Sequence, residues 1–294
     1  MSPFLKEYDG NEDDELLVNE AKAGNKKALE KLLLKHQPYI YNLAWRMVRQ
    51  PKDAEDLTQE VNVKIITKLS EFQGRSAFRT WLYRIVTNHF LMAQRKPMEE
   101  YMSGFDKHAE GLLNVKKDEV ELSTEEMEQH RDTIKEVTYG CMSGMLLCLT
   151  REQRLVYILG DMFRADHTVG SEMLEISKSN FRQRLTRARQ DMNNYMQNKC
   201  GLVNPKNPCR CHKKVQFVLK NKIVDSRNLL FNREEYVNFH HEVVKPHTHQ
   251  TRELIDDKYQ ELLRNLPFKK DMDKSTILDD VINDKRFKNL FNLN

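Results

Sequence analysis

Three cysteines and a histidine are the residues of this sequence best suited to metal or redox chemistry. Cys200, Cys209, Cys211 and His212 fall within thirteen positions, and thiolates with imidazole form a donor set that suits zinc. The spacing is not that of two CxxC knuckles, and adjacent Cys211 and His212 need not reach the same ion. Three interpretations stay open: a structural zinc site, redox-active thiols, or cysteines that bind nothing.

Catalytic motifs give no competing signal. The sequence has no Gly-rich phosphate loop, no HExxH, and no Ser or Cys nucleophile in a recognisable setting. Four histidines, His240, His241, His247 and His249, gather around Pro246, where a surface cluster is a commoner explanation than a metal or pH sensor. We therefore predict a protein that is not an enzyme and that requires no cofactor.

Charge is segregated along the chain although the formal net charge is only +4. Residues 98–132 contain eleven acidic and four basic residues, whereas residues 177–189 contain five basic residues and no acidic one. Local fields of this kind steer a polyanion to one face of a protein. The basic stretch follows a turn near residues 175–177, so the sequence predicts a helix-turn-helix.

The second helix of that motif can pack through Phe181, Leu185, Ala188 and Met192, which recur at helical spacing. Residues near the start of a recognition helix reach base edges, and later arginines meet phosphates. The residues then available to DNA are Lys178, Ser179, Asn180, Arg182, Gln183, Arg184 and Arg187.

Residues 53–96 predict two further amphipathic helices joined by a short polar loop. Asp53 is the expected N-cap of the first helix and Ser76 that of the second. An acid-and-amide face on the first helix is the candidate protein-binding surface: Asp53, Glu55, Asp56, Gln59, Glu60 and Asn62. In the second helix an apolar face around Phe78, Trp81 and Leu82 is the expected core.

A loop with Gly, Gln and Ser can accommodate an unstacked base, and basic side chains beside it bind phosphates. The residues of the loop and of the helix after it that we assign to this role are Phe72, Gln73, Arg75, Ser76, Arg79, Thr80, Arg84 and Asn88.

Elsewhere the pattern predicts helices with few interruptions. Asn25 is an expected N-cap, and Pro38 should break one helix and open the next. Residues 97–123 should be largely extended or disordered, because they lack a sustained period. Thr150 and Gln153 form a capping-box pattern. Helical spacing returns in residues 253–266 and 277–291, which predicts a helical C-terminal extension that packs on the second DNA-binding domain or binds a partner.

Composition fits an all-α protein of 294 residues with 39% hydrophobic and 31% charged residues. No run of 18 apolar residues could span a membrane, and the acidic N-terminus lacks the features of a signal peptide. The five cysteines are odd in number and unevenly spread, which argues against a disulfide framework. We therefore expect no membrane insertion and a cytoplasmic location.

Two stretches resemble a known family. DAEDLTQEV (53–61) and FQGRSAFRTWLYRIVTN (72–88) resemble the second conserved region of bacterial RNA polymerase sigma factors of the extracytoplasmic-function type, and SNFRQRLTRAR (179–189) resembles their fourth region. Asn62 stands where the family commonly has a large apolar residue, and Glu175 where it often has Gly. A Cys-rich segment with the core NPCRC follows the fourth region in one subset of the family.

The resemblance implies two small helical domains joined by a flexible linker. We expect an acidic tail at 1–15, a region-2-like domain at 16–97, an acidic linker at 98–132, a region-4-like domain at 133–199, the Cys-rich segment at 200–214 and the extension at 215–294. The helix at 53–69 should then dock on the clamp of the largest polymerase subunit, and the loop at 72–76 with the helix after it should engage the melted −10 element. The residues at 178–187 should read the −35 element, and their domain should contact the flap of the second-largest subunit.

These expectations amount to a sigma factor that binds core RNA polymerase and promoter DNA, with an anti-sigma factor as a further partner. Two other classes compete with it. One is a stand-alone helix-turn-helix regulator that binds duplex DNA without polymerase. The other is an interaction module whose basic helix binds an acidic protein.

Overall fold

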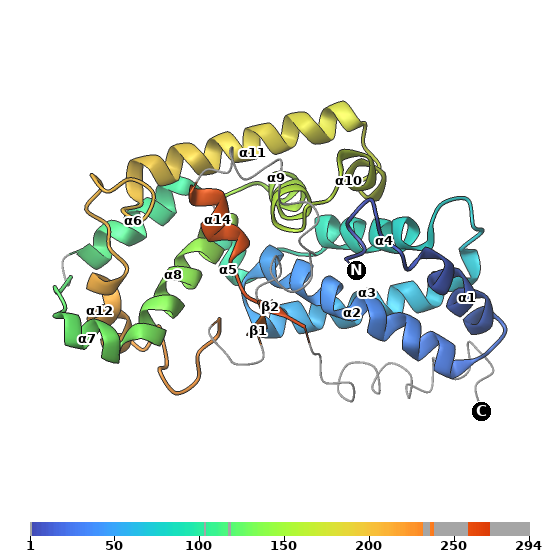
Figure 1. The fold of residues 1–294 in the computed structure, drawn as a ribbon, viewed down its shortest axis with the longest axis horizontal. Coiled ribbons are helices and arrows are strands. Elements are labelled where there is room, and N and C mark those ends of the chain that lie inside the picture. The colour runs from blue at the N-terminus through green and yellow to red at the C-terminus, as the bar shows by residue number, and fades with distance from the viewer. Residues whose placement is uncertain (1, 103, 117–118, 232–235, 238–257, 271–294) are drawn as a thin grey trace. The chain divides into compact units, whose positions relative to one another are not determined.

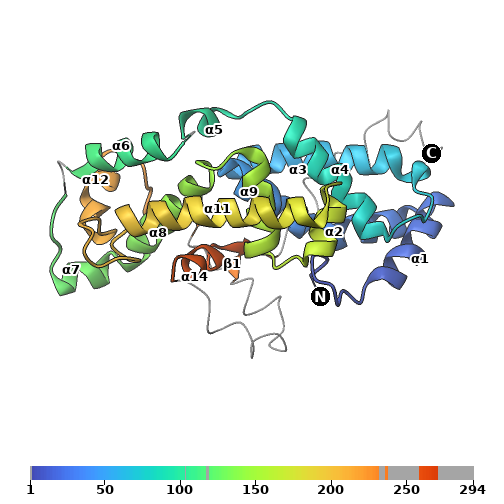
Figure 2. The same cartoon turned by 90° about the horizontal axis from the view of Figure 1, so that it is seen from above.

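The computed structural model describes residues 2–102, 104–116, 119–231, 236–237 and 258–270. Over these residues the all-α prediction is confirmed (Figures 1 and 2), since the strands β1 (Tyr236–Val237) and β2 (Phe268–Lys269) are two residues long and pair only with each other. None of the described helices combines the length and the apolar character needed to cross a membrane.

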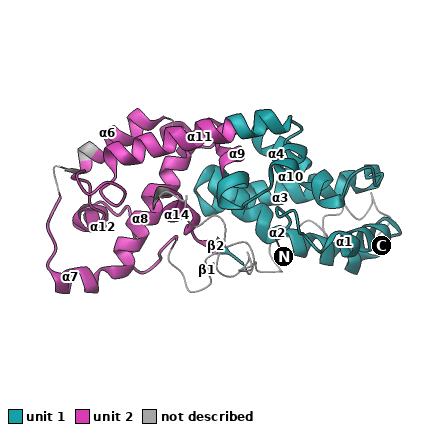
Figure 3. Cartoon of the chain, turned by 45° about the horizontal axis from the view of Figure 1, so that its top comes forward, with its two compact units in different colours: residues 1–95, 158–183, 269–294 teal, residues 96–157, 184–268 magenta. Residues whose placement is uncertain are grey.

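The chain forms two compact units, which Figure 3 colours separately. Unit 1 comprises residues 1–95, 158–183 and 269–294, and unit 2 comprises residues 96–157 and 184–268. These units interleave along the sequence, and the domain bounds expected above stay predictions.

Unit 1 is built on four helices, α1 (Asn11–Lys22), α2 (Lys26–Val48), α3 (Pro51–Lys68) and α4 (Phe78–Met92), with the 3₁₀ turn η1 (Leu69–Glu71) between the last two. Their apolar faces bury Leu32, Ile40, Val61, Ile65 and Phe78 almost completely. Asn25 caps α2 as predicted, since its side chain accepts hydrogen bonds from the amides of Lys27 and Ala28. The remaining parts of unit 1 are the π-helical turn η2 (Ile158–Met162), α10 (His167–Met173) and the start of α11 (Lys178–Lys199).

Three predicted helix boundaries in unit 1 are wrong. Pro38 lies inside α2 and does not divide it, because packing of α2 against α1 and α3 outweighs the ~3 kcal/mol that an internal proline costs. The third helix begins at Pro51, with Gln50 and not Asp53 as its N-cap, since proline favours the first helical position. Ser76 is not a cap either: α4 begins at Phe78 after Ala77, which makes no side-chain cap.

Residues 2–10 are a packed part of unit 1. Phe4 is fully buried, and its ring lies 4.8 Å from that of Tyr83 and 4.9 Å from that of Phe163. The guanidinium of Arg79 donates to the carbonyl of Pro3 at 3.0 Å. The segment that we expected to be an acidic tail therefore covers one side of the helical core.

Asp14, at the start of α1, is the buried carboxylate of this unit. It accepts a hydrogen bond from the Tyr8 hydroxyl at 2.9 Å, and its oxygens lie 2.7 Å from Lys35 Nζ and 3.3 Å from His36 Nε2. Burial alone would raise the pKa of Asp14, but the hydrogen bonds and charges of His36 and Lys35 outweigh burial and hold that pKa below its usual value.

Unit 2 contains more helix than the sequence predicted. Residues 97–123 were expected to be largely extended, yet α5 (Pro97–Tyr101) and α6 (Phe105–Lys116) lie there, so that prediction is wrong. The unit continues with α7 (Thr124–Gln129), α8 (Arg131–Leu146), α9 (Arg151–Tyr157) and the main part of α11. Thr150 and Gln153 form the predicted reciprocal cap ahead of α9, with bonds of 3.2 and 3.3 Å.

Glu99 explains why α5 is ordered. Its carboxylate is 2% exposed and accepts hydrogen bonds from Arg151 Nη2 at 2.6 Å and from Arg154 Nη1 at 2.9 Å. Burial acts to raise the pKa of Glu99, but the bond from Arg151 and the charge of Arg154 prevail and lower it. A short helix with no amphipathic repeat is thus held by one buried ion-pair network.

The C-terminal extension is helical where it is described, in η3 (His212–Lys214), α12 (Val215–Lys220) and α14 (Lys258–Arg264). Glu136 of α8 anchors part of it, because its carboxylate accepts the backbone amides of Leu230 at 2.7 Å and Phe231 at 2.9 Å. The predicted helices at 277–291 and the four clustered histidines lie outside the described residues.

Candidate nucleic-acid interface

The exposed face of α3 carries most, but not all, of the predicted acid-and-amide surface. Glu55, Asp56 and Glu60 are exposed, and Asp53 and Gln59 are half-buried. Val63, 41% exposed, adds an apolar side chain to the same helix. This surface is anionic with one apolar side chain, so its charge is complementary to a basic protein surface.

Asn62 does not belong to that surface, so this part of the prediction is wrong. It is completely buried, and neither atom of its amide has a hydrogen-bond partner in the described part of the chain. The helix turns it inward next to Val61 and Ile65, both also fully buried. Its side chain therefore belongs to the core and not to the exposed face.

Glu60 also ties α3 to α4. Its carboxylate lies 3.0 Å from Nε2 of the buried His89, whose Nδ1 lies 2.7 Å from Lys64 Nζ. Burial and the charge of Lys64 lower the pKa of His89 below its ordinary value, against the opposing effect of Glu60. His89 therefore acts as a neutral positioning group near neutral pH and not as a phosphate-binding cation.

The loop after η1 borders an open pocket of about 290 Å³. Phe72, Gln73 and Gly74 form one wall, and Glu15, Asn19 and Lys22 of α1 form the other. Lys22 Nζ donates to the carbonyl of Phe72 at 3.0 Å, which fixes the loop. Gly74 has a φ of 70°, the left-handed region that glycine adopts without steric cost.

The predicted single-strand contacts divide by burial. Gln73 and Arg75 are exposed and Ser76 is half-buried, so these side chains are accessible beside the pocket. Phe72 packs into the core, its ring 5.4 Å from both Phe78 and Trp81. Arg79 and Thr80 are also buried. Three of the eight predicted residues are thus buried, and of these three only Phe72 lines the pocket.

The helix-turn-helix is present as predicted, although its second helix is 22 residues long. Asp166 caps α10 by accepting from the Thr168 amide, and Ser177 accepts the Asn180 amide at 3.1 Å at the start of α11. Phe181 packs so closely on Gly170 that a Cβ there would lie 2.5 Å from the ring. Glu175 supplies the turn at a φ of 53°, a conformation that costs a non-glycine residue ~1–2 kcal/mol.

The predicted recognition residues are exposed or half-buried. Phe181, Leu185, Ala188 and Met192 are all buried, which confirms the inward face of α11. On its other faces Lys178, Ser179, Arg182, Gln183 and Arg187 are exposed, and Asn180 and Arg184 are half-buried. The start of α11 therefore presents a cationic surface.

A contact that the sequence did not predict joins α4 to α10, which lie side by side in unit 1 (Figures 1 and 2). Arg84 Nε donates to the carbonyl of Glu172 at 2.8 Å, and the Thr87 hydroxyl donates to that of Met173 at 2.9 Å. The Glu175 carboxylate accepts from Asn88 Nδ2 at 3.2 Å and lies 4.0 Å from Arg84 Nε. Two predicted single-strand contacts, Arg84 and Asn88, are thus occupied by the turn of the helix-turn-helix.

Comparison with known proteins decides the family. The model for sigma-70 region 2 matches residues 32–97, which include α3, the loop and α4. The chain is 37% identical over 99 residues to the RNA polymerase sigma-H factor of Pseudomonas aeruginosa, a match that covers 32% of this chain and 51% of that one. It is 27% identical to the ECF RNA polymerase sigma-E factor of Haemophilus influenzae and 26% identical to that of Escherichia coli, over 63% of this chain and 95% and 94% of theirs.

The chain is a sigma factor of the extracytoplasmic-function type, in the sigma-70 family. Against the sigma-H factor it spans about half of the relative's length. In a solved structure of CnrH in complex with the cytosolic domain of CnrY, one chain is similar at a TM-score of 0.43 and 20% identity, over 62% of this chain and 96% of that one.

The cysteines of this sigma factor are arranged differently from the predicted zinc set. His212 contacts a carboxylate instead, since its Nε2 lies 3.1 Å from the exposed Glu121. Cys200, Cys209 and Cys211 instead line a small cavity together with Cys141 of α8 and His108 of α6. Among the described residues no group of three or more His, Cys, Asp or Glu side chains stands in metal-ligand geometry.

The sequence interpretation missed Cys141 and His108. Cys141 falls in the apolar repeat of α8, where a cysteine passes for a small hydrophobic residue. The uneven spread of the cysteines was the available signal, because it left Cys141 unexplained. Burial raises the pKa of Cys209, and it raises that of Cys211 to about 11. Reactive thiols have a lowered pKa, so these two are poor redox nucleophiles.

Proposed function

We propose that this sigma factor binds core RNA polymerase, recognises two promoter elements and helps to open the DNA between them. The observation that carries the proposal is the composition of unit 1. An exposed acidic face on α3, an open pocket lined by Gln73, and residues 178–183 of α11, with Lys178 and Arg182, occur in one compact body. Each has the chemistry for a different part of the task.

Docking on polymerase falls to α3. Glu55 and Asp56 are exposed within its first two turns, and Glu60 and Val63 follow on the same helix. An anionic helix face fits a basic surface on the clamp of the largest subunit, and charge complementarity would mainly raise the association rate. The contacts of Glu60 and Lys64 with His89 fix this face relative to α4.

We assign the binding of single-stranded DNA to the pocket between α1 and the 72–76 loop. The exposed amide of Gln73 can donate to and accept from a base edge, and Arg75 can bind the adjoining phosphate. The Lys22 bond and the conformation of Gly74 hold the loop in place before DNA arrives. A base that has left the stack in the −10 element is the ligand that we assign to this pocket.

We assign the binding of duplex DNA at the −35 element to α11. Lys178, Asn180 and Gln183 lie in its first two turns, where a recognition helix meets base edges. Arg182, Arg184 and Arg187 are placed for phosphates or for guanine. The domain that carries α11 would also contact the flap of the second-largest subunit.

The α4–α10 contact has a consequence for this proposal. While Glu172 and Glu175 engage them, Arg84 Nε and Asn88 Nδ2 are not available to DNA. Promoter binding through these two atoms therefore requires α10 to leave α4. We propose that assembly with core polymerase separates the two helices, which makes the free chain a poor DNA binder.

Run-off transcription with core polymerase on genomic promoter fragments tests the proposal. Arg187→Ala should weaken binding to the −35 duplex and reduce its salt dependence by about one unit for the lost phosphate contact. Gln73→Ala with Arg75→Ala should leave duplex binding intact and impair melting, measured by permanganate reactivity. Glu55→Lys with Asp56→Lys should reduce pull-down of core polymerase, whereas the matched variant Glu30→Lys, on the exposed surface of α2, should not.

The competing classes give different results in the same assays. A stand-alone helix-turn-helix regulator would bind duplex DNA equally well with and without polymerase. An interaction module would bind neither duplex DNA nor core polymerase. Equal effects of the Arg187 and Gln73 variants on duplex binding would contradict the division of labour between α11 and the loop.

We further propose an anti-sigma factor as a partner, and a cytoplasmic location where polymerase works. Polymerisation chemistry would belong to the core enzyme, so the chain itself needs no catalytic residues. The C-terminal extension would be regulatory. If truncation after residue 214 leaves promoter activity and its regulation unchanged, that role is wrong.

A further inference from the structure

The segment before α1 makes contacts that neither polymerase docking nor DNA binding explains. Residues 2–9, here called the N-terminal strap, pack on the helices of unit 1. Phe4 is completely buried. Its ring lies 5.9 Å from that of Tyr39 in α2 and 4.8 Å from that of Tyr83 in α4. One aromatic side chain of the strap therefore contacts two helices of the core.

The same ring also contacts the segment that leads into α10. The rings of Phe4 and Phe163 are stacked, with centroids 4.9 Å apart and planes inclined by 1°. The guanidinium of Arg46 in α2 lies 5.0 Å from the centroid of Phe163. Phe163 follows η2 directly and precedes α10. The strap and α2 together therefore hold the chain just before the helix-turn-helix begins.

Arg79 of α4 is the second residue that the strap engages. Its Nη1 donates to the carbonyl of Pro3 at 3.0 Å and to that of Leu5, and its guanidinium lies 5.1 Å from the ring of Tyr8. Arg79 is 8% exposed, although it is one of the residues that we expected to contact the −10 strand. The strap thus covers an arginine that single-stranded DNA would have to reach.

The hydrogen bonds of Arg79 are incomplete in this arrangement. Its Nε is buried and has no hydrogen-bond partner among the described residues, and burial lowers the pKa of Arg79. A buried polar group without a partner disfavours the state that buries it. Opening of the strap would return this group to water, so the closed arrangement contains a driving force for its own release.

We propose that the N-terminal strap is an autoinhibitory contact, which covers Arg79 and, through Phe4 and Phe163, keeps α10 next to α4. A chain that is mostly closed binds a ligand of the open state with an affinity reduced by the open fraction. The inference rests on the proposed function, because it concerns access to the DNA-binding residues of this sigma factor. It adds a second hold on α10, formed by residues that take no part in the contacts of Arg84, Asn88 and Glu175.

Hydrogen exchange in the free, full-length chain tests the hold on α10 without DNA or polymerase. In Phe4→Ala the amides of residues 2–9 and of α10 should exchange at least about tenfold faster, because both segments open locally, whereas the amides of α3 should keep their native rates. The matched control is Phe231→Ala, the same substitution at a side chain of unit 2 that is 4% exposed. It should leave the exchange of α10 unchanged.

Binding of the free chain to a labelled single-stranded −10 oligonucleotide tests the inhibition. Phe4→Ala should tighten this binding by about five- to tenfold, since the open fraction rises. Deletion of residues 2–9 removes the strap and leaves α1 intact, so it should have the same effect even if Phe4→Ala fails to fold. Fluorescence anisotropy at fixed salt measures both variants against the native chain.

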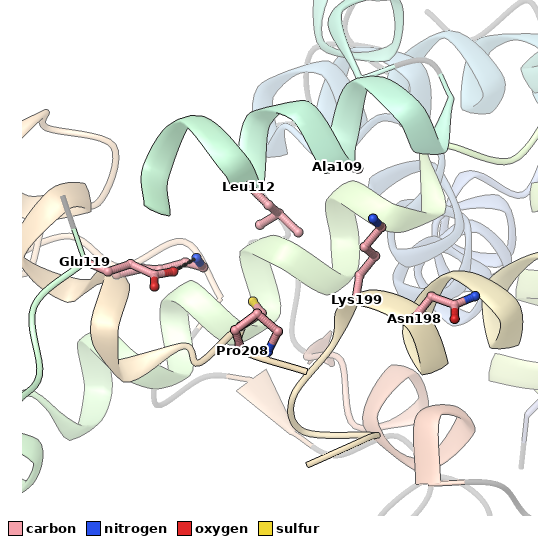
Figure 4. A pocket seen from close by; sticks show the side chains of 8 residues that line it. Ala109, Leu112, Glu119, Asn198, Lys199 and Pro208 are labelled. Carbon is pink, nitrogen blue, oxygen red and sulfur yellow. Dashed lines mark hydrogen bonds and ion pairs between the residues drawn. The ribbon is translucent and has the colours of Figure 1, made fainter. Parts of the chain in front are cut away.

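A pair of lysine variants separates release of the strap from a change in net charge. The charge of Lys6 in the strap acts on Asp166, the N-cap of α10. Lys6→Ala should therefore tighten oligonucleotide binding by about twofold in spite of the lost positive charge. Lys199→Ala loses the same charge at the end of α11, where Figure 4 shows Lys199 beside a pocket of unit 2. It should not tighten binding.

Three results would overturn the inference. Faster exchange of residues 2–9 alone, with α10 unchanged, would mean that the strap does not hold α10. Equal acceleration in α3 and α10 would make Phe4 an ordinary core residue of unit 1. Unchanged oligonucleotide affinity in both Phe4→Ala and the deletion would remove the inhibitory role, while run-off transcription with core polymerase would still support the proposed function. Loss of the proposed function would instead appear as a native chain that directs no run-off transcription.

Discussion

Asn62 shows at the scale of one residue how a departure from the family pattern is tolerated. Its amide is fully buried without a partner among the described residues, and such a group costs ~1–3 kcal/mol. Asn62→Leu, similar in volume, should therefore raise the free energy of unfolding by about 1–2 kcal/mol, measured by urea denaturation. Core-polymerase binding should not change, because the side chain is not on the exposed face of α3.

Asn42 provides the matched control. It is equally buried, but its Nδ2 donates to the carbonyls of Pro38 at 2.7 Å and Lys269 at 2.8 Å, and its Oδ1 accepts the Lys269 amide at 2.9 Å. Asn42→Leu should destabilise the chain by about 1–3 kcal/mol, since the backbone carbonyl and amide of Lys269 in β2 would lose their hydrogen-bond partner. Equal destabilisation by both substitutions would mean that Asn62 has a partner in solution.

Single residues also mark the limit of prediction from sequence. Helical spacing identified Phe181, Leu185, Ala188 and Met192 as buried, and each is, because a helix repeats its inward face at a fixed interval. The same reasoning placed Asn62 outward, and Asn62 is buried. Spacing gives the direction of a side chain only once the neighbouring helices are known, and those contacts are not local.

At the scale of elements, the α4–α10 contact depends on Glu175. This residue holds a left-handed turn at a cost of ~1–2 kcal/mol, and its carboxylate contacts Arg84 and Asn88. Glu175→Gly should remove the strain, keep the turn and weaken the contact by the ~0.5–1 kcal/mol of an exposed pair. Binding of the free chain to a labelled single-stranded oligonucleotide should then tighten by about two- to fivefold.

Two variants separate the effects of charge and backbone. Glu175→Asn should tighten binding to the same degree, because Asn tolerates the left-handed conformation but lacks the reach to α4. Glu152→Gln removes one exposed acid from α9 and should leave binding unchanged. Tighter binding in all three variants would mean that the lost negative charge causes the effect, and that the α4–α10 contact does not limit DNA binding.

Helix boundaries were predictable where a local signal decides them. Asn25 and the Thr150–Gln153 pair cap their helices as the sequence predicts, because a cap depends on three or four neighbouring residues. The prediction that Pro38 divides two helices was wrong because non-local contacts decide that boundary. Packing on two neighbouring helices keeps α2 continuous, and no local pattern reveals that packing.

At the scale of the whole molecule, buried ion pairs determine how the chain responds to acid. The pKa of Glu99 is lowered from 4.5 by Arg151 and Arg154, and that of Asp14 is also lowered. A lowered folded-state pKa means that the stability from these groups is complete above the pKa of the unfolded chain and is lost as pH falls through the folded value. Unfolding should therefore become easier as pH falls below about 4.5.

Glu99→Gln isolates the larger network. It removes the charge between two arginines that are 11% and 4% exposed, which should cost about 3 kcal/mol at pH 7 and flatten the fall in stability below pH 4.5. Its control is Glu128→Gln, whose pair with Arg131 is 77% and 65% exposed at 3.6 Å and should contribute less than about 0.5 kcal/mol. Guanidinium denaturation at several pH values measures both. If the two variants lose equal stability, apolar packing and not the Glu99 network holds α5 in place. The hydrogen bonds that Glu99 accepts from Arg151 and Arg154, more than fifty positions away, would then be a consequence of that packing.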